Sequence, residues 1–383
     1  MIPRFKPSLG AKEFLKIFKP NKNAVSDFEK AFAKDFNSVD AVAFPYGRSA
    51  QWAFFKALKI ENSEIIMPAY TCSVVAHSIS LSGNKPRFVD INLDDFNMNL
   101  EILKKTINKK TKAIIATHTF GYPQNIDELE EIVKNAEDKF GKKIWLIQDC
   151  CHAFGAEYKG RMIGTSGDVA LYAFNISKTM NSIFGGMLTF QSQELADKIR
   201  LWRDTNFKKS SIFKSIKRRL YLLAVYFAFN KYIYGITLWI QNNTSLIDVF
   251  TKAYHLDDRI HFPKDYLEKM SNIEAAIGLV QLKKYPKIIE YRRKMAKIYD
   301  KDLTKENWKL PPIIEGATYS HYAVQVPNKN EVMKKYIKKG IQLGEVIEYS
   351  IPDLECYKNI GDNCPNSRKA SQTTINFSVT KSK

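Results

Sequence analysis

Hydrophobic and polar positions in the first half of the chain follow two alternating patterns. Short apolar runs alternate with longer segments whose apolar residues recur at the spacing of an α-helix. The runs that predict strands are 41–47, 64–68, 86–91, 112–118, 143–149, 168–174 and 185–190. The segments that predict helices are 27–35, 49–60, 73–83, 98–107 and 127–141. This alternation is typical of an α/β fold, in which helices cover both faces of a mostly parallel sheet.

The pattern changes toward the end of the chain. Residues 265–303 predict one long helix, kinked at Pro286 because proline removes a backbone hydrogen bond. A strand at 321–327, a helix at 331–340 and a short strand after Ile341 are expected to follow. This order of elements predicts a small α+β unit.

The amount of apolar sequence favours two packed units. The chain has 383 residues and is 45% hydrophobic, which is enough for one large core and a smaller one. We therefore predict a large α/β domain at 1–263 and a smaller α+β domain at 264–383.

Charge and cysteine content narrow the functional classes. The chain has 59 Lys and Arg against 40 Asp and Glu, a net charge of +19, so its surface attracts anions such as nucleic acid, acidic lipid or phosphorylated small molecules. The charge is dispersed and no helix-turn-helix or RNA-recognition signature is visible, which disfavours nucleic acid. The five cysteines lack the spacing of a zinc site or a disulfide framework, so no metal site is predicted. The N-terminal sequence lacks the apolar core of a signal peptide, and a cytoplasmic protein is expected.

Residues 207–243 fit neither pattern and are interpreted as an insertion. Apolar residues run from Leu220 to Phe229 and resume from Tyr232 to Ile240, and each run is too short to span a bilayer. Basic residues come first: Lys208, Lys209, Lys214, Lys217, Arg218 and Arg219. The insertion is an interfacial element on an anionic membrane, an exposed dimer arm or a buried helical pair. In the first case the protein would be peripheral on the cytoplasmic face of the inner membrane.

Two charged residues are placed for cofactor chemistry. Asp149 ends one apolar strand and Lys178 follows the next, and ligands of α/β sheets bind at the carboxyl ends of strands. Pyridoxal 5′-phosphate (PLP) needs a lysine to form a Schiff base with its aldehyde and a carboxylate to keep its pyridine nitrogen protonated. Its phosphate would lie at the helix N-terminus formed by residues 47–50. The alternative is that Asp149 is a helix cap and Lys178 is merely solvated.

Several phrases carry a family resemblance. They are IPRFKPSLG (2–10), GRSA (47–50), MPAYT (67–71), PRFVDINLDDFNMN (86–99), HTFGYPQNID (118–127), the phrase from Gln148 to Lys178, and MSNIEAAIGLVQL (270–282). With these phrases the chain resembles the DegT/DnrJ/EryC1/StrS family of PLP-dependent sugar aminotransferases over nearly its whole length. The resemblance implies fold type I, with a seven-stranded sheet sandwiched by helices, and a homodimer with shared active sites.

The resemblance also implies roles for individual residues. Lys178 resembles the lysine that binds the cofactor, and Asp149 the partner of its pyridine nitrogen. His152 falls where the family commonly has a glutamine near the ring's phenolic oxygen, although it is also compatible with simple packing. The implied cofactor contacts are Gly47, Arg48, Ser49, Ala50, Cys72, Asp149, His152, Asn175, Ser177, Lys178 and Lys269. The candidate substrate contacts are Tyr70 and His321.

Three positions depart from the family pattern. Cys72 replaces an aromatic residue that stacks on the cofactor, Ala173 replaces a serine that binds the phosphate, and Leu267 replaces an asparagine contributed by the partner subunit. The groups expected to compensate are Arg48, Ser49, Asn175 and Ser177. For Arg48 a surface salt bridge is an equal alternative.

The implied reaction moves an amino group from an amino acid, L-glutamate by family habit, to a keto sugar. The sugar is expected to be nucleotide-linked or, if the insertion binds membrane, lipid-linked, and destined for a cell-surface glycan. Family members with a histidine in place of Lys178 resemble dehydratases, so the lysine favours an aminotransferase. The alternatives are a non-catalytic or regulatory homologue with the PLP fold and a nucleic-acid-binding protein.

Overall fold

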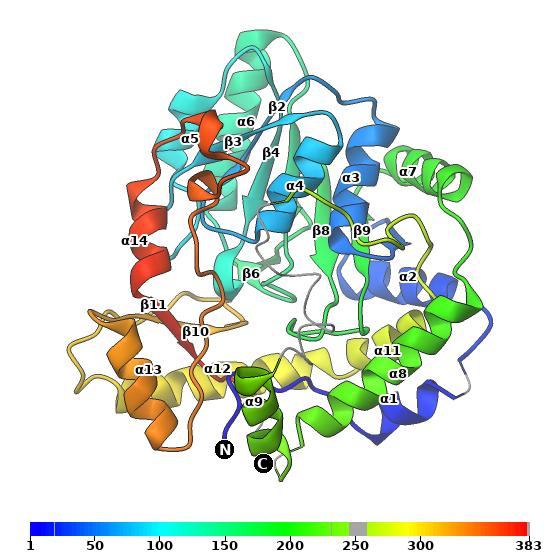
Figure 1. Cartoon of the computed structure of the whole chain (residues 1–383). Helices are drawn as coiled ribbons and strands as arrows, with labels where there is room; N and C mark the ends of the chain where they lie inside the picture. Colours follow the sequence, from blue (N-terminus) through cyan, green and yellow to red (C-terminus); the bar gives the residue numbers. More distant parts are fainter. Residues whose placement is uncertain (19, 231, 245–258, 381–383) are drawn as a thin grey trace.

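A seven-stranded sheet in the order β1-β9-β8-β5-β4-β2-β3 forms the centre of the protein (Figure 1). The computed structural model describes residues 1–18, 20–230, 232–244 and 259–380. The strands of the sheet are β1 Asp40–Phe44, β2 Glu64–Pro68, β3 Lys85–Val89, β4 Thr111–Thr117, β5 Trp145–Asp149, β8 Val169–Ala173 and β9 Gly186–Phe190. Strand β9 runs antiparallel to both of its neighbours, and the other pairs are parallel. The expected α/β fold with a mostly parallel sheet is confirmed, and each strand overlaps an apolar run that predicted it, although β1, β3 and β4 begin one residue earlier than expected.

Helices cover both faces of this sheet, because successive strand residues, which point to opposite faces, are almost all buried. On β1, Val42 and Phe44 pack with helices of one layer, while Ala41 and Ala43 pack with helices of the other. The helices that pack on the sheet are α2 Ala24–Asp35, α3 Gly47–Ala57, α4 Ser73–Leu81, α5 Leu100–Thr106, α6 Ile126–Phe140 and α7 Gln193–Asn206. Their N-terminal caps include Asn99 and Asn125, whose side chains accept hydrogen bonds from the first turns of α5 and α6.

The long helix expected at 265–303 is two helices. Helix α11 Asn272–Leu282 begins only after Ser271, which forms a capping box with Glu274. Helix α12 Tyr285–Asp302 has Pro286 in its first turn, where a missing N–H costs nothing. The prediction was therefore wrong for 265–271, because the capping box fixes a later start, and Pro286 begins a helix instead of kinking one.

The end of the chain forms a small antiparallel pair, β10 Tyr322–Gln325 with β11 Thr374–Phe377. The strand expected after Ile341 was wrong: its residues make only isolated bridges, Ile341 with Ile2 and Gly344 with Asn376. The remaining short elements are α1 Ala11–Lys16, η1 Thr119–Gly121, β6 Glu157–Tyr158, β7 Arg161–Met162, α13 Lys329–Lys338, η3 Ile351–Asp353, η4 Lys358–Ile360 and α14 Pro365–Thr373. The domain boundary at 263/264 stays a prediction, and residues 245–258 of the first expected domain lie outside the described residues.

The insertion forms two helices, α8 Ile212–Ala228 and α9 Tyr234–Asn243, with Lys231 outside the described residues. Helix α8 lies along α11 (Figure 1). Two basic residues of α8 point inward. Lys214 donates to the carbonyls of Glu268 and Lys269, and Arg218 forms ion pairs with Asp265 and Glu274. Within the described ranges, no helix is both long and apolar enough to cross a bilayer.

Candidate active site

The carboxyl ends of β4, β5 and β8 meet at one edge of the sheet and hold a buried carboxylate. Asp149, the last residue of β5, is 3% exposed. Its carboxylate accepts hydrogen bonds from the hydroxyl of Thr117 at 3.2 Å and from the backbone N–H of Cys151 at 3.1 Å. These bonds compensate the burial and fix the orientation of the carboxylate.

A neutral histidine, His118, lies close to Asp149 and bonds to its backbone carbonyl. His118 Nδ1 accepts from the N–H of Gln124 at 3.0 Å, so the ring proton is on Nε2, which lies 3.0 Å from Gln148 Oε1. Burial lowers the pKa of His118 to about 4, although the nearby Asp149 acts in the opposite direction. The backbone N–H of His118 donates to the carbonyl of Asp149 at 3.1 Å, which ties the ends of β4 and β5 together.

Lys178 is presented by a tight turn after β8. The side-chain oxygen of Asn175 accepts from the N–H and the hydroxyl of Ser177 at 3.1 and 2.7 Å, and its carbonyl accepts from the N–H of Lys178 at 3.0 Å. Lys178 and Asp149 line the same pocket, which we call the Lys178 pocket. The Lys178 amine has no hydrogen-bond or ion-pair partner in the part of the chain that the structure describes, so it is available to a ligand.

The N-terminus of α3 opens into this pocket. Gly47 begins the helix, and a Cβ added there would come within 2.8 Å of the Ala173 Cβ, so only glycine allows β8 to pack this closely. Arg48 also lines the pocket and is buried, so it does not lie on the surface. A helix N-terminus beside a buried guanidinium is suited to a phosphate group.

His152 contributes an unsatisfied polar atom. The side chain is 6% exposed, and its Nδ1 has no hydrogen-bond partner among the described residues. The ring stacks on Phe120, with centroids 6.1 Å apart, and meets the ring of His321 at 5.7 Å. Burial, together with the charges of Lys178 and His321, lowers the pKa of His152 well below its usual range, so the imidazole is neutral. A buried nitrogen without a partner fits a ligand atom better than a packing role.

The structure brings part of the expected set together. The expected cofactor contacts that line the Lys178 pocket are Gly47, Arg48, Cys72, Asp149, His152, Asn175 and Lys178. Ser49, Ala50, Ser177 and Lys269 do not line it. Tyr70 and His321 are also outside the lining, although His321 contacts His152.

Each expected residue outside the pocket has another partner. The Ser49 hydroxyl donates to the Tyr266 carbonyl at 3.0 Å, and the Ala50 N–H donates to the Tyr46 carbonyl at 3.0 Å within α3. Lys269 forms an ion pair with Asp204 at 2.8 Å. Tyr70 is fully buried, and its hydroxyl donates to the Ile347 carbonyl at 3.2 Å.

Sequence reasoning missed other members of the pocket. Thr117 was detectable, because it ends an apolar strand next to the strand of Asp149. Tyr46 and Phe184 also line the pocket, but as aromatic residues beside glycines they gave no functional signal. Near Cys72, the hydroxyl of Tyr349 accepts a hydrogen bond from the N–H of Ser73 at 2.9 Å, but Tyr349 does not line the pocket.

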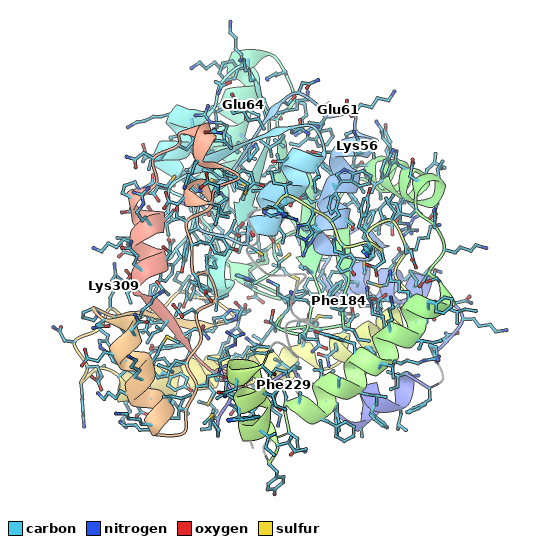
Figure 2. The ribbon with its side chains drawn as sticks, viewed as in Figure 1. Lys56, Glu61, Glu64, Phe184, Phe229 and Lys309 are labelled. Carbon is cyan, nitrogen blue, oxygen red and sulfur yellow. The ribbon has the colours of Figure 1, made fainter. Side chains whose placement is uncertain are left out.

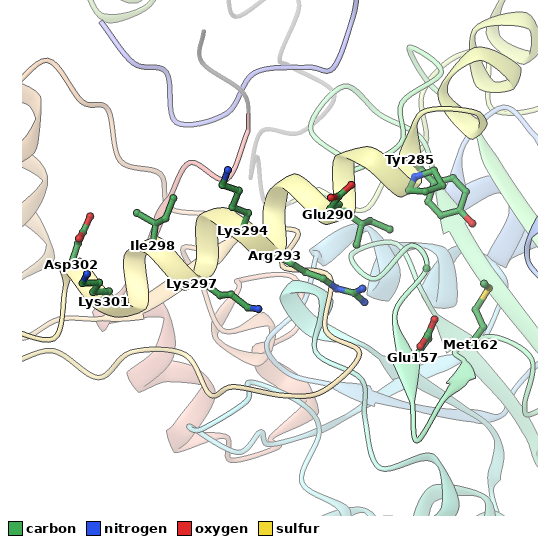
Figure 3. A pocket seen from close by; sticks show the side chains of 13 residues that line it. Glu157, Met162, Tyr285, Glu290, Arg293, Lys294, Lys297, Ile298, Lys301 and Asp302 are labelled. Carbon is green, nitrogen blue, oxygen red and sulfur yellow. The ribbon is translucent and has the colours of Figure 1, made fainter.

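A second hollow is an open groove on the surface between α12 and the β6–β7 hairpin (Figure 3). Lysines of α12 line it, and Arg293 donates to the carbonyls of Gly316 and Ala317. Neither Lys178 nor Asp149 is near this groove, so the combination of lysine, carboxylate and helix N-terminus is found in the Lys178 pocket.

The groups of the Lys178 pocket fit PLP. The cofactor carries an anionic phosphate, an aldehyde, a basic ring nitrogen and a phenolic oxygen. Facing the pocket are a helix N-terminus with a guanidinium, a lysine amine, a buried carboxylate and the unpartnered His152 Nδ1.

Comparisons with known proteins find relatives in sequence and in fold. The chain is 28% identical over 311 residues to GDP-perosamine synthase of Escherichia coli O157:H7, covering 79% of this chain and 71% of the relative. It is 27% identical over 339 residues to the spore coat polysaccharide biosynthesis protein SpsC of Bacillus subtilis, covering 85% and 74%. The solved structure of AtS13 from Actinomadura melliaura superposes with a TM-score of 0.79 at 23% identity, covering 99% and 94% of the two chains.

A second solved structure, the sugar aminotransferase CalS13 from Micromonospora echinospora, gives a TM-score of 0.78 at 19% identity, covering 99% and 95%. At these identities the superpositions show the fold, which is fold type I. The DegT/DnrJ/EryC1/StrS aminotransferase family matches residues 17–233 and 251–382. The chain therefore belongs to the DegT/DnrJ/EryC1/StrS aminotransferase family and is a PLP-dependent aminotransferase.

Proposed function

We propose that the protein transfers an amino group from L-glutamate to a nucleotide-linked keto sugar, in the synthesis of a cell-surface glycan such as lipopolysaccharide. The observation that carries this proposal is that Lys178 and the buried Asp149 line one pocket at the carboxyl edge of the sheet. The choice of substrate is supported by relatives named GDP-perosamine synthase and UDP-4-amino-4,6-dideoxy-N-acetyl-beta-L-altrosamine transaminase. The same relatives and the retained pair Lys178 and Asp149 speak against a non-catalytic or nucleic-acid-binding homologue.

The residues of the pocket would hold PLP at four points. Arg48 and the first N–H groups of α3 would bind the phosphate, Asp149 the ring nitrogen, His152 the phenolic oxygen and Lys178 the aldehyde. When bound, PLP supplies a carbonyl that accepts the amino group and a ring that withdraws electrons from the neighbouring carbon.

The protein's own groups then have separate tasks. Asp149, fixed by Thr117 and the Cys151 N–H, would place its carboxylate where a protonated ring nitrogen needs it. The Lys178 Nζ has no other partner in the described chain. It would take the proton from the α-carbon of the amino acid and pass it to the former aldehyde carbon of the cofactor, which receives the amine. The neutral His152 would offer a hydrogen bond without adding a second positive charge beside Lys178. Tyr46 and Phe184 would limit access of water.

The half-reaction with the amino donor is tested by absorbance of the PLP-loaded protein. We expect a visible absorbance band that shifts on addition of L-glutamate, and borohydride reduction that adds the cofactor's mass to the peptide containing Lys178. Lys178→Ala should lose both, whereas Lys297→Ala, in the open groove of Figure 3, should keep both. A wild-type protein that binds no PLP would favour the non-catalytic alternative. The acceptor is then identified by which keto sugar, nucleotide-linked or lipid-linked, restores the original band.

We also propose a homodimer in which residues 264–272 reach the partner's pocket, with Lys269 near the partner's phosphate. This arrangement is supported by the family resemblance. Within one chain Lys269 pairs with Asp204, on a segment bridged to Lys208. Light scattering should give twice the chain mass, and Lys269→Ala should weaken PLP binding while the dimer persists. A monomer with full activity would contradict the arrangement.

For the insertion we propose contact with an anionic membrane on the cytoplasmic side. Its outward face is apolar, with Phe213 79% exposed, and cations such as Lys209 and Lys217 flank it. The exposed apolar side chains of α8, of α9 and of the turn between them are Ile212, Phe213, Ile216, Leu220, Tyr226, Phe227, Tyr232, Ile233, Ile236 and Trp239. An apolar face bordered by cations is complementary to acidic headgroups.

This contact is measured by sedimentation with vesicles that contain phosphatidylglycerol, with pure phosphatidylcholine vesicles for comparison. Combined Phe213→Ser and Trp239→Ser should abolish binding, and Leu201→Ser, an equally exposed apolar residue on α7, should not. The proposal would be wrong if the double variant and the Leu201→Ser control bound the vesicles equally, or if the wild type did not bind them. Loss of the dimer in the double variant would instead assign the face to a second copy of the chain.

A further inference from the structure

Arg218 of α8 is the centre of a buried polar network that connects the insertion to the catalytic domain. Its Nε donates to Glu274 at 2.7 Å, and its Nη2 donates to Asp265 at 2.7 Å and to the hydroxyl of Tyr46 at 2.8 Å. The Tyr46 hydroxyl in turn donates to Asp265 at 2.7 Å. Glu274 is fully buried and Arg218 is 9% exposed, whereas the Asp265 side chain is 25% exposed, so one largely buried cation bonds to one buried and one partly exposed carboxylate.

The same guanidinium packs on two walls of the Lys178 pocket. Its central carbon lies 4.4 Å from the ring centroid of Phe184 and 5.7 Å from that of Tyr46. Phe184, labelled in Figure 2, lies between the sheet and α8. Tyr46 is the N-cap residue of α3 and directly precedes Gly47, so its position sets where the helix N-terminus begins.

The loop between Lys178 and Phe184 also depends on α8 for its conformation. Ile183 has φ of 75°, a left-handed conformation that a β-branched side chain adopts only under constraint. Its side chain is fully buried in a cluster with Leu222 of α8 and Ile273 of α11, and the adjacent Phe184 meets Tyr221 at 5.1 Å between ring centroids. Helix α8 therefore supplies packing that a strained backbone in this loop requires.

We propose that Arg218 is a positioning residue of the aminotransferase, which fixes Tyr46 at the phosphate end of the pocket and Phe184 at its wall. The assignment rests on the proposed function for its effect on PLP, but the positioning itself is a property of the protein alone. The insertion is thus part of the active-site architecture, in addition to any contact its outer face makes.

The test uses the full chain with Arg218→Met, which keeps length and apolar packing but removes the charge, and Arg218→Lys, which keeps the charge but loses the fork of donors. Arg219→Met is the matched control, because the neighbouring Arg219 donates to the Ile17 carbonyl and lies away from the pocket. Tyr46→Phe removes only the hydroxyl that bonds to Arg218 and Asp265. It replaces Arg218→Met as the test variant if Arg218→Met does not fold.

Two readouts separate positioning from general stability. In hydrogen–deuterium exchange without cofactor, Arg218→Met should raise exchange in the peptides around 45–49 and 179–186, and Arg219→Met should not. In PLP titration, Arg218→Met should weaken binding by about ten-fold or more, Arg218→Lys by less, and Arg219→Met by under about two-fold.

Each outcome is decisive. Unchanged exchange and unchanged PLP affinity in Arg218→Met would overturn the assignment, as would equal effects in the Arg219→Met control. If the exchange pattern changes as expected while the wild-type protein binds no PLP, the positioning role stands and the proposed function fails.

Discussion

The hydroxyl of Thr117 donates to the carboxylate of Asp149 across 3.2 Å, and the two residues are direct partners in the register of β4 and β5. The sheet itself therefore sets the orientation of the site's carboxylate. A shift of one residue in either strand would turn one of the two side chains to the opposite face.

Replacing Thr117 by valine should weaken PLP binding by roughly two- to ten-fold, because one hydrogen bond to the carboxylate contributes about 0.5–1.5 kcal/mol. Asp149→Asn should have a larger effect, of about 10- to 100-fold, since the charge that pairs with the ring nitrogen is lost. Spectroscopic titration of each apo protein with PLP measures both changes.

The control for this pair is Thr111→Val at the other end of β4. Thr111 is also fully buried, and its hydroxyl accepts from the N–H of Asn108 at 3.0 Å. This variant should lose stability without a change in PLP affinity. If Thr111→Val and Thr117→Val reduce PLP affinity equally, the register contact has no special role in the site.

Acidification should destabilise the protein through His118. Its pKa is lowered to about 4 by burial, whereas in the unfolded chain it is about 6.5, so below 6.5 the unfolded state binds more protons and stability falls as the pH drops toward 4. The loss approaches about 1.4 kcal/mol per pH unit for one such group. Urea unfolding of the wild type between pH 7 and 4 should show this slope, and His118→Gln should show a smaller one at lower overall stability. An identical slope in both proteins would assign the acid sensitivity to other groups.

Local patterns in the sequence were sufficient for the central sheet and for the pair at its edge. Buried parallel strands are continuous apolar runs, and the polar residue that ends such a run is readily seen, as with Asp149. Contacts between distant segments were not readable in this way. Ser49 was expected to bind phosphate, but its hydroxyl bonds to Tyr266, 217 positions away.

The insertion shows the same limit. The sequence left open whether it is a membrane element, an exposed dimer arm or a buried helical pair. In the structure the buried positions Lys214, Arg218, Leu222 and Val225 recur at helical spacing along one face of α8. Charge alone could not decide this, because the acidic partners Asp265 and Glu274 lie about 50 residues later in the chain. Strand β11 was missed for a related reason, since it is short and is stabilised by pairing with the distant β10.

Replacing Gly47 by alanine should destabilise the protein, because even one added carbon does not fit. In Gly47→Ala the new Cβ would lie 2.8 Å from the Ala173 Cβ, and both atoms belong to secondary-structure elements that cannot easily separate. We expect a loss of about 1–3 kcal/mol from overpacking, with weaker PLP binding because α3 must move. Gly235→Ala is the matched change in α9, where an added Cβ meets nothing within 4 Å, and it should be neutral or stabilise by up to about 1 kcal/mol. Thermal unfolding with and without PLP compares the two, and similar effects would contradict the packing argument.

Glu29 of α2 should be among the most sensitive residues outside the pocket. Its carboxylate accepts from Arg200 at 2.6 Å, from Arg203 at 2.5 Å and from the N–H of Ala43 at 2.7 Å, and so it joins α2, α7 and β1. Because Arg203 is itself buried, Glu29→Ala leaves it with only the more exposed Asp204, 3.0 Å away, as a counter-charge and leaves the Ala43 N–H without its acceptor, which should cost about 1–3 kcal/mol. Urea unfolding should show this loss, whereas Glu101→Ala, which breaks the exposed pair with Lys104, should leave the midpoint nearly unchanged. A Glu29→Ala protein as stable as Glu101→Ala would mean that water reaches Arg203 and replaces the carboxylate.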